Sequence, residues 1–477
     1  MLAVAAWDLR RPAIVAFLCA LVAAGSWGAV EARADAPLLG TAEPGYQTGS
    51  AQHRRFLFDE TAKAGAGVVR LNAFWFRVAP SRPADPRNPT DPAYRFDELD
   101  AAVRSATKRG LRVLLTLQRA PEWAESEPNG EDRGAWKPDV NAFGDYAHAV
   151  ATRYSGSFDD PFDPAGPLPR VRYFQAWNEA NLEKFYAPQR AGGRSVSADR
   201  YRLLLNHAHD ELKAVDPANV VVVAGTGPKG PSAPTRTAPL EWWRRLLCLN
   251  DRLRPKPGCP AARFDVFDHH PITVEHPPTA HGRDGEILIA DYHRLTRLLH
   301  AAERQGTVGG PAQHEQWASE IYWETDPPET RRGYPEKQAA RFLEQGIYLL
   351  ARQDVDVILN FFMIDAPLTR PGDVANVQGG LLDARGRRKD SFTAFRFPFV
   401  VDRRSKRSAL AWGIAPRKGV VAIQRRRRGR DRLGWKTVAR IRAGDSDVFR
   451  KRIPLRGRAE LRARIRQDKS LVWEQAR

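Results

Sequence analysis

The stretch Arg170-Val171-Arg172-Tyr173-Phe174-Gln175-Ala176-Trp177-Asn178-Glu179-Ala180-Asn181 begins as a β-strand and ends in polar groups. Val171, Tyr173 and Phe174 favour extended structure, and the run stops at Trp177-Asn178-Glu179. An acid beside an amide and a large ring suits sugars, because the ring stacks on the sugar face and the acid protonates a glycosidic oxygen. The alternative is a strand-end glutamate that faces solvent, and the rest of the chain has to separate the two.

The unit around this stretch recurs along the first 400 residues as a helix, a Gly or Asp-Pro stop, and a short strand. We expect helices at 52–64, 97–108, 140–154, 198–215, 288–304 and 336–352. Besides the strand quoted above, we expect strands at 67–75, 111–117, 219–225, 264–268, 315–320 and 355–362, with a weaker first one near 40–46. This alternation predicts an α/β fold with a parallel sheet, and eight units favour a closed (β/α)8 TIM barrel. The first strand is not followed by Gly-x-Gly-x-x-Gly, which argues against a dinucleotide site.

Polar and aromatic side chains stand where the expected strands end. They are Arg70, Asn72 and Trp75; Gln118, Pro121 and Trp123; Trp177, Asn178 and Glu179; His269 and His270; Glu320; and Asp365. The carboxyl ends of barrel strands form one rim, where (β/α)8 proteins carry their functional groups. One such residue would fit simple packing, but six strands ending in this way predict a site at the rim.

Glu179 and Glu320 end the fourth and seventh expected strands, so they should face each other across the barrel mouth. Cleavage of a glycoside needs two carboxyl groups, one to protonate the leaving oxygen and one to attack carbon or activate water. Burial near Trp177 and a second carboxylate would raise the pKa of the acid. Arg70 could hold the other carboxylate ionised, and His270 could bond it or the substrate.

Other residues compete for these roles. Glu315 lies before the core of its strand and Glu324 lies in the following loop, so Glu320 is the better candidate. His269 and His270 could be a metal pair, but adjacent strand residues point to opposite faces. We expect no metal and no cofactor at this site.

These residues resemble the retaining glycoside hydrolases of clan A, the (β/α)8 enzymes of family 5, family 39 and their relatives. In that clan an Asn-Glu pair ends the fourth strand, as Asn178-Glu179 does here, and the Glu is the acid/base. The nucleophile ends the seventh strand, and Trp317-Ala318-Ser319-Glu320-Ile321 is similar to its setting. The resemblance covers about residues 40 to 400 and includes the closing segment from Gly380 to Phe395.

The resemblance implies a glycosidase that acts on an oligosaccharide or polysaccharide by a double displacement. It implies substrate-binding roles for Arg70, Trp75, Trp123, Trp177, Asn178, His270, Trp317 and Asp365. Asn178 would reach the 2-hydroxyl of the sugar. Three residues depart from the clan pattern, namely Ala180 in place of Pro, Ile272 in place of Tyr, and Met363 near the position of an eighth-strand Trp. A glycan-binding protein without activity is the alternative.

The N-terminus is typical of a secretion signal spanning residues 1–36. Arg10 and Arg11 precede an apolar run, and Ala34-Asp35-Ala36 offers small residues for cleavage. The run is short for a bilayer span, and a retained anchor is the alternative. Cys248 and Cys259 would then form a pair in an oxidising compartment, where we expect a disulfide. The chain is expected to be secreted or bound to the cell envelope.

Residues 401–477 differ from the barrel segment, 37–400, in pattern and in charge. They carry 25 Lys or Arg against 7 Asp or Glu, a net charge of +18 out of +19 for the chain. Short alternating strands at 420–424, 435–441, 449–453, 461–465 and 471–473 predict a small antiparallel β-sandwich of immunoglobulin or fibronectin type. The run Arg425 to Arg428 is more consistent with a solvated turn or contact with an anionic cell surface than with nucleic-acid binding. The secreted actinobacterial members of the clan with a basic β-domain are similar in organisation.

Overall fold

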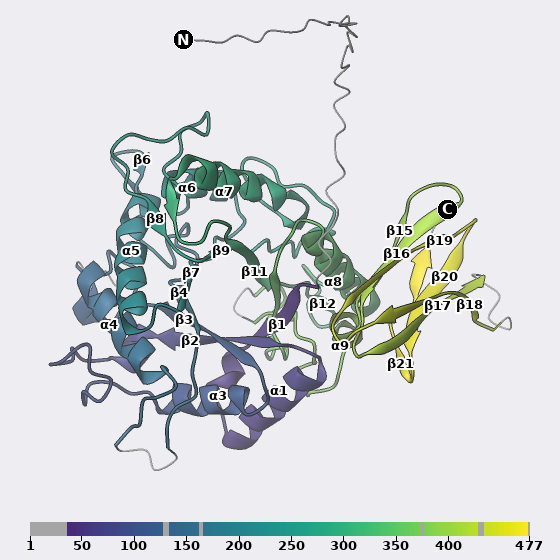
Figure 1. The fold of residues 1–477 in the computed structure, drawn as a ribbon, viewed down its shortest axis with the longest axis horizontal. Helices are drawn as coiled ribbons and strands as arrows, with labels where there is room; N and C mark the ends of the chain where they lie inside the picture. The colour runs from purple at the N-terminus through teal and green to yellow at the C-terminus, as the bar shows by residue number, and fades with distance from the viewer. Residues whose placement is uncertain (1–35, 127–132, 162–165, 374–375, 428–433, 476–477) are drawn as a thin grey trace, which may run out of the picture. The chain divides into compact units, whose positions relative to one another are not determined.

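The computed structural model describes residues 36–126, 133–161, 166–373, 376–427 and 434–475. Eight parallel strands close into a barrel in the order β1-β14-β11-β9-β7-β4-β3-β2, and helices surround it (Figure 1). The barrel strands are β1 Leu38–Ala42, β2 Val68–Phe74, β3 Arg112–Gln118, β4 Tyr173–Ala176, β7 Val220–Val223, β9 Val266–Asp268, β11 Glu315–Ile321 and β14 Val357–Phe361. The predicted (β/α)8 barrel is confirmed.

The helices of the barrel lie close to their expected bounds, except that α7 begins at His293 rather than 288, after a 3-10 turn at Ile289–Asp291. They are α1 Ala51–Lys63, α3 Asp97–Thr107, α4 Val140–Arg153, α5 Ser197–Val215, α7 His293–Gln305 and α8 Glu336–Ala351. Local signals set their ends: Ser50 and Asp139 accept hydrogen bonds from the backbone N–H groups of His53 and Ala142, and Gly306 ends α7 with φ 65°. The structure adds α2 Trp75–Val78, α6 Pro239–Leu246 and α9 Asp390–Arg396, which are short.

Strand alternation separates two apolar layers. Inside the lower barrel pack Val68, Leu114, Val222, Val266, Trp317, Val357 and Leu359. The larger core lies between the strands and the helices and includes Val69, Leu71, Leu115 and Phe174. Because side chains alternate along a strand, Arg70 and Asn72 share the inner face of β2 with Val68. Polar groups therefore follow an apolar floor toward the carboxyl ends of the strands.

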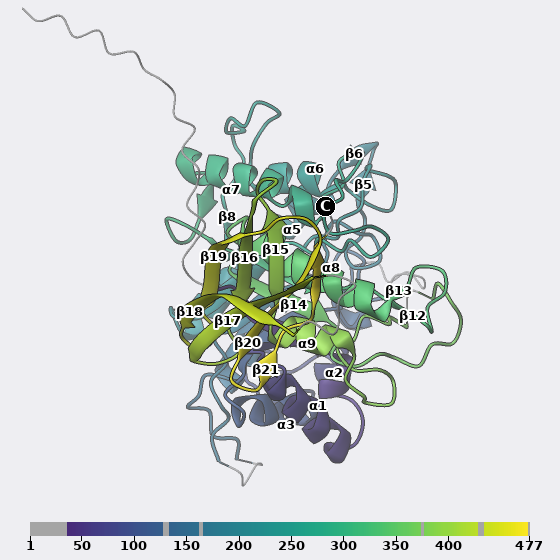
Figure 2. The same cartoon turned by 90° about the vertical axis from the view of Figure 1, so that its right-hand side faces the viewer.

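The C-terminal residues form two antiparallel sheets, as predicted, and they pack beside α8 and α9 (Figure 2). One sheet holds β15 Phe399–Arg403, β16 Ser408–Ile414 and β19 Val448–Pro454. The other holds β17 Gly419–Arg427, β18 Lys436–Ala443, β20 Ala459–Ile465, β21 Asp468–Lys469 and β22 Trp473–Gln475. Strand β15 begins two residues before the expected boundary at 401, and its polar–apolar alternation is too weak to mark it in the sequence. The end of the arginine run, at Arg428, lies outside the described residues.

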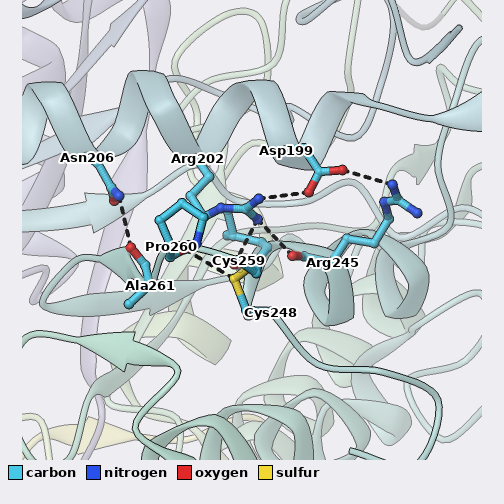
Figure 3. Close-up of a disulfide and its surroundings, with 9 residues drawn as sticks. Asp199, Arg202, Asn206, Arg245, Cys248, Cys259, Pro260 and Ala261 are labelled. Atoms are coloured by element: carbon cyan, nitrogen blue, oxygen red, sulfur yellow. Dashed lines mark hydrogen bonds and ion pairs between the residues drawn. A yellow bond between two sulfur atoms is a disulfide. The ribbon is translucent and has the colours of Figure 1, made fainter. Parts of the chain in front are cut away.

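The expected disulfide joins Cys248 and Cys259, whose Cα atoms are 5.7 Å apart. It closes a loop after α6 that is held against α5 (Figure 3). Arg202 of α5 donates to the carbonyl oxygen of Arg245 at 2.9 Å, and Asp199 pairs with Arg202 and Arg245 at 2.8 Å each. The expected secretion signal, 1–36, lies almost wholly outside the described residues, so its cleavage stays a prediction. Among the described helices, none has the length and apolar character to cross a bilayer.

Candidate active site

Three buried side chains meet at the carboxyl ends of β4, β9 and β11. One ligand-type atom each of Glu179, His270 and Glu320 lies within 4.8 Å of the other two. Glu179 and Glu320 keep 7% and 8% of their surface exposed, and His270 is fully buried. The two glutamates that the sequence singles out therefore lie together at the rim of the barrel, in a setting largely removed from water.

Arg70 of β2 connects the two sides of this cluster. Its Nη1 group pairs with Glu320 Oε1, its Nη2 group donates to Asn178 Oδ1 at 2.6 Å, and its Nε–H donates to Thr116 Oγ1 at 2.7 Å. A guanidinium with three such partners is held in one orientation and fixes the position of the carboxylate that it contacts. The expected role of Arg70 beside Glu320 thus has a geometric basis.

His270 contacts both carboxylates from the opposite side. Its Nδ1 atom lies 3.0 Å from Glu179 Oε1 and 3.7 Å from Glu320 Oε1, and its Nε2 atom lies 3.0 Å from Ser319 Oγ. Burial opposes protonation, but the charge of Glu320 and the hydrogen bonds to Asp268 and Glu179 outweigh it and raise the pKa of His270 to about 10. His270 is accordingly an imidazolium at neutral pH.

Asp268 is the partner that the sequence reasoning did not single out. It is fully buried, accepts from Gln175 Nε2 at 2.6 Å and from the Ser319 backbone N–H at 3.1 Å, and lies 3.6 Å from His270 Nε2. Burial alone would raise the pKa of Asp268, but His270, Ser319 and Arg70 together hold it below its ordinary value. A carboxylate in this position stabilises the positive charge of His270.

A belt of hydrogen bonds links these groups across the barrel interior. From Arg70 it runs through Thr116 Oγ1 to Gln175 Oε1 at 2.7 Å, and from the Gln175 amide to Asp268. Thr116 and Gln175 are register partners on β3 and β4. The signal that could have revealed them is a polar residue inside an otherwise apolar strand, as in Leu115-Thr116-Leu117 and Phe174-Gln175-Ala176.

A glycine beside His270 and an irregular strand, β11, allow these polar side chains to pack closely. A Cβ atom on Gly225 would lie 2.2 Å from His270 Nε2, so only glycine fits there. The register of β11 against β14 shifts between Ala318 and Ile321. That shift lets Ser319 and Glu320, which are adjacent, both reach partners inside the barrel.

Trp177 does not face the site, in contrast to the expectation that it stacks on substrate. Its Nε1–H donates to the carbonyl oxygen of Phe185 at 2.7 Å, and its ring centroid lies 5.4 Å from that of Phe143 on α4. Trp177 and Glu179 both adopt left-handed backbone conformations, with φ of 80° and 39°. This turn sends the indole outward, while Asn178 and Glu179 point into the barrel.

Two other tryptophans also lie in packed layers. Trp317 belongs to the apolar floor of the barrel, with its ring centroid 5.4 Å from that of Tyr173. Trp75 is fully buried and stacks on Tyr146 of α4 at 5.4 Å, because β2 ends one residue earlier and α2 begins there. The structure therefore corrects the expected substrate contacts of Trp75, Trp177 and Trp317, since strand direction and chain turns place their rings elsewhere.

Trp123 and Asp365, which were also expected to contact substrate, lie in different surroundings. Trp123 is half-buried, donates to the Ala79 carbonyl oxygen at 3.0 Å, and carries the Arg82 guanidinium 4.9 Å from its ring centroid. Asp365 forms a buried ion pair with Lys389 at 2.9 Å, which accounts for its charge without a substrate.

The competing acids lie in separate surroundings. Glu315 is exposed at the start of β11 and accepts from Trp317 Nε1. Glu324 is fully buried and pairs with Arg332 at 2.7 Å, and burial raises its pKa to about 7. His269 turns away from His270, as strand alternation predicts, and lies 2.8 Å from Thr226 Oγ1. Glu320 is thus the acid of β11 that meets Glu179.

The carboxyl ends of the strands carry an apolar wall near the acids, and a cavity lies at the end of β2. Tyr322, Phe362 and Val377 pack together with half-buried Ile272 and Phe361. The eighth strand, β14, ends at Phe361, and Met363, two residues later, is fully buried. A cavity of about 650 Å³ lies at the carboxyl end of β2, lined by Asn72 and Phe74 of β2 and by Gln47, Phe76 and Arg77, among others.

Glu179, His270 and Glu320 each offer one ligand atom, a carboxylate oxygen or an imidazole nitrogen, at distances that suit a metal ion. Such an ion would have to displace a proton from His270, whose pKa is about 10, and would lie beside the Arg70 guanidinium. Metal ligation requires a neutral imidazole. The charges at the site therefore fit two ionisable carboxyls and two organic cations better than a metal centre.

Comparisons with known proteins establish the fold. No protein-family model and no curated protein matches the chain. A family 39 glycoside hydrolase from the gut symbiont Bacteroides cellulosilyticus WH2 has a similar structure, with 14% identity, 88% of this chain and 79% of that chain covered, and a TM-score of 0.55. The GH39 enzyme from Xanthomonas axonopodis pv. citri matches at 15% identity over 88% of this chain and 93% of that chain, with a TM-score of 0.49.

A GH5_18 structure from Streptomyces cattleya in complex with GlcNAc matches at 15% identity over 76% of this chain and 79% of that chain, with a TM-score of 0.48. At 14% identity, the first of these similarities shows a shared (β/α)8 fold. A fold hosts many activities, so the chemistry must be argued from the residues at the site.

Proposed function

We propose that this protein is a glycosidase that cleaves O-glycosidic bonds with retention of configuration. The observation that carries the proposal is the pair of buried carboxyls, Glu179 and Glu320, with oxygens within 4.8 Å of each other at the rim of the barrel. Retaining enzymes hold their two carboxyls about 5–5.5 Å apart, whereas inverting enzymes leave about 6.5–9.5 Å for a water molecule. The short separation favours retention.

Glu320 is the nucleophile in this proposal and Glu179 the acid/base. Glu320 attacks the anomeric carbon while Glu179 gives its proton to the departing oxygen, so the glycosidic bond breaks as an ester to Glu320 forms. Water then attacks the same carbon, Glu179 takes one of its protons, and the Glu320 carboxylate is released. Arg70 favours Glu320 as the nucleophile, because its guanidinium contacts the Glu320 carboxylate directly and orients it.

The charges around the acids stay balanced in both steps. In the free enzyme, the cations Arg70 and His270 face the anions Glu320 and Asp268, and Glu179 carries the proton to be transferred. In the ester intermediate Glu320 is neutral and Glu179 is the anion. His270 contacts both carboxyls, so its positive charge lies beside whichever of them is ionised. Such fixed charges stabilise the transition state without reorganisation.

Asn178 and the cavity beside β2 supply contacts for the substrate in this proposal. The Asn178 oxygen accepts from Arg70, which leaves the amide N–H group to donate to the 2-hydroxyl. Asn72 and Phe74 lie beyond Arg70 on the same face of β2, and the cavity that they line combines amide, aromatic and charged groups. That lining fits further sugar units of an oligosaccharide.

The first prediction concerns turnover of aryl glycosides. The wild type should hydrolyse at least one member of a panel of β-linked nitrophenyl glycosides, and Glu320→Gln should leave only background turnover, because the amide cannot attack. Glu179→Gln should lower kcat by about 10²–10⁴-fold, and more strongly for poorer leaving groups, because these need the proton most. The measurement is steady-state kinetics on both variants.

Glu315→Gln is the matched control, since it removes an exposed carboxylate from the same strand and should keep wild-type rates. A 2-fluoro glycoside should label Glu320 covalently. Label on Glu324, or a wild type that binds glycans and turns none over, would contradict the proposal, and the second result would support a glycan-binding protein.

A further inference from the structure

The outer face of the sheet formed by β18, β17 and β20 carries arginines in register. Arg440 and Arg464 are the cross-strand partners of Ala422 on its two sides, and Arg442 pairs with Val420. Arg462 lies opposite Gln424 and donates to it at 2.9 Å. Neighbouring strands lie about 4.8 Å apart and alternate residues about 7 Å apart, so these side chains form a grid of cations on one face of the sheet. The three strands lie side by side in Figure 2.

We call Arg440, Arg442, Arg462 and Arg464 the arginine face. Within the described residues Arg440, Arg442 and Arg464 form no ion pair with a carboxylate, and all three are exposed. Glu460 pairs with Arg426 instead, and Asp468 pairs with Arg417 and Arg396. These two acids therefore pair with cations other than the four of the arginine face.

The arrangement opposes folding, because like charges on neighbouring strands repel. Burial lowers the pKa of Arg462, and the charges of Arg464 and Arg426 lower it further. Of the 25 cations in residues 401–477, 20 are arginines. Arginine binds carboxylates through two parallel N–H groups, which the point charge of lysine does not. Closely spaced guanidinium groups that repel one another and can each donate two hydrogen bonds are suited to binding an external polyanion.

We propose that the arginine face binds a linear polysaccharide that carries carboxylates, and so holds the barrel near its substrate. The choice of a polysaccharide rests on the proposed glycosidase function, whereas the preference for a polyanion rests on the sheet alone. Nucleic acid fits less well. Trp435, the aromatic ring beside the arginine face, already stacks with the guanidinium groups of Arg462 and Arg426, 4.2 and 4.8 Å from its centroid. Single-stranded nucleic acid needs free rings on which bases stack.

The test uses the full chain and polygalacturonate as the probe, with binding measured by calorimetry at low and physiological salt. The triple variant Arg440→Gln/Arg442→Gln/Arg464→Gln should lose about ten-fold or more in affinity, and wild-type binding should weaken as salt rises. The matched control Lys406→Gln/Arg407→Gln/Lys418→Gln removes the same charge from turns outside the sheet and should change affinity less than about two-fold.

Neutral dextran should not bind, and duplex DNA, single-stranded DNA and phosphatidylglycerol vesicles should bind more weakly than polygalacturonate. Equal losses in the two triple variants would show that net charge alone matters, and tighter binding of DNA or vesicles would replace the polysaccharide as partner. Either result overturns the proposal. Turnover of a soluble aryl glycoside should be unchanged in the arginine-face variant, so a wild type without turnover would count against the glycosidase proposal and not against this surface.

Discussion

At the scale of single residues, the balance of charge around Asp268 is the most distinctive feature of the site. Arg70 and His270 are two cations within reach of two glutamates, and Asp268 is the anion that balances the second cation. Asp268 therefore places a buried negative charge beside His270, on the side away from the two glutamates. Asp268 acts through His270 and is therefore a positioning residue.

Asp268→Asn should lower the pKa of His270 from about 10, because it removes a buried negative charge 3.6 Å away. Protonated His270 is then lost at a lower pH, and the alkaline limb of kcat/KM should move to lower pH with a fall in kcat of about 10–100-fold. NMR titration of the histidines and a pH–rate profile measure the two effects.

Asp100→Asn is the control, since Asp100 is a buried carboxylate that pairs with Arg153 away from the acids. It should lower stability and leave the alkaline limb in place. An alkaline limb that does not move in Asp268→Asn would show that Asp268 has only a structural role.

At the scale of elements, local sequence signals predicted most strands and helices. They did not predict several contacts at the candidate site. The periodic pattern and the Gly or Asp-Pro stops predicted the barrel strands to within a few residues, and the structure confirms them. Helices α6 and α9 have 8 and 7 residues, too short for a clear helical period. Strand β16 was not predicted, because Ala409 to Ile414 is an apolar run without alternation. Such runs fit a strand and a buried helix equally.

The loop after α6 is stabilised by a covalent cross-link rather than by its own backbone hydrogen bonds alone. The disulfide closes a loop with a sequence separation of 11. In the chain-entropy treatment, a loop of this size stabilises the folded state by about 2–3 kcal/mol. Cys248→Ser/Cys259→Ser should therefore lower the free energy of unfolding by that amount, measured by urea denaturation.

The same loop is remote from the acids in the fold, so the double serine variant should keep its kcat on an aryl glycoside. Wild type treated with a reductant is the second control and should match the variant. Equal stability of the oxidised wild type and the variant would show that the hydrogen bonds from Arg202 suffice to hold the loop.

At the scale of the whole molecule, α8 joins the barrel to the C-terminal sheets. Tyr348 donates to Asp402 at 2.8 Å and packs on Trp412, with ring centroids 5.2 Å apart. One turn earlier, Glu344 is fully buried, pairs with Arg341 at 2.7 Å and accepts from the Phe399 N–H group. Burial raises the pKa of Glu344 to about 8. This joint should therefore respond to pH.

The folded pKa of Glu344 lies above its ordinary value of 4.5, so its contribution to stability is full below about pH 4.5 and is lost as pH rises through about 8. Glu344→Gln should flatten the dependence of the unfolding free energy on pH in that window, by a few kcal/mol at most. Urea denaturation at several pH values measures it.

Glu43 and Glu324 also have a raised pKa, about 7 each, so the difference between variant and wild type isolates Glu344. Glu336→Gln, which removes an exposed carboxylate from the same helix, is the control and should follow the wild-type curve. A Glu344→Gln curve parallel to wild type would contradict the prediction.

The sequence by itself determined the number and order of the barrel strands, the antiparallel character of the C-terminal sheets and the disulfide pair. It also placed Asn178-Glu179 and Glu320 at the ends of two opposite strands, because strand ends and stops are local properties of the chain. Arg70 stood out for the same reason.

Only the tertiary structure decided which neighbouring side chains face the site. Left-handed residues turn Trp177 outward, and a register shift in β11 brings Ser319 and Glu320 inward while Trp317 stays in the floor. The partners of the belt come from distant strands, with Arg70 and Glu320 separated by 250 positions. Side-chain direction and long-range pairing depend on how the barrel closes, so the local sequence cannot specify them.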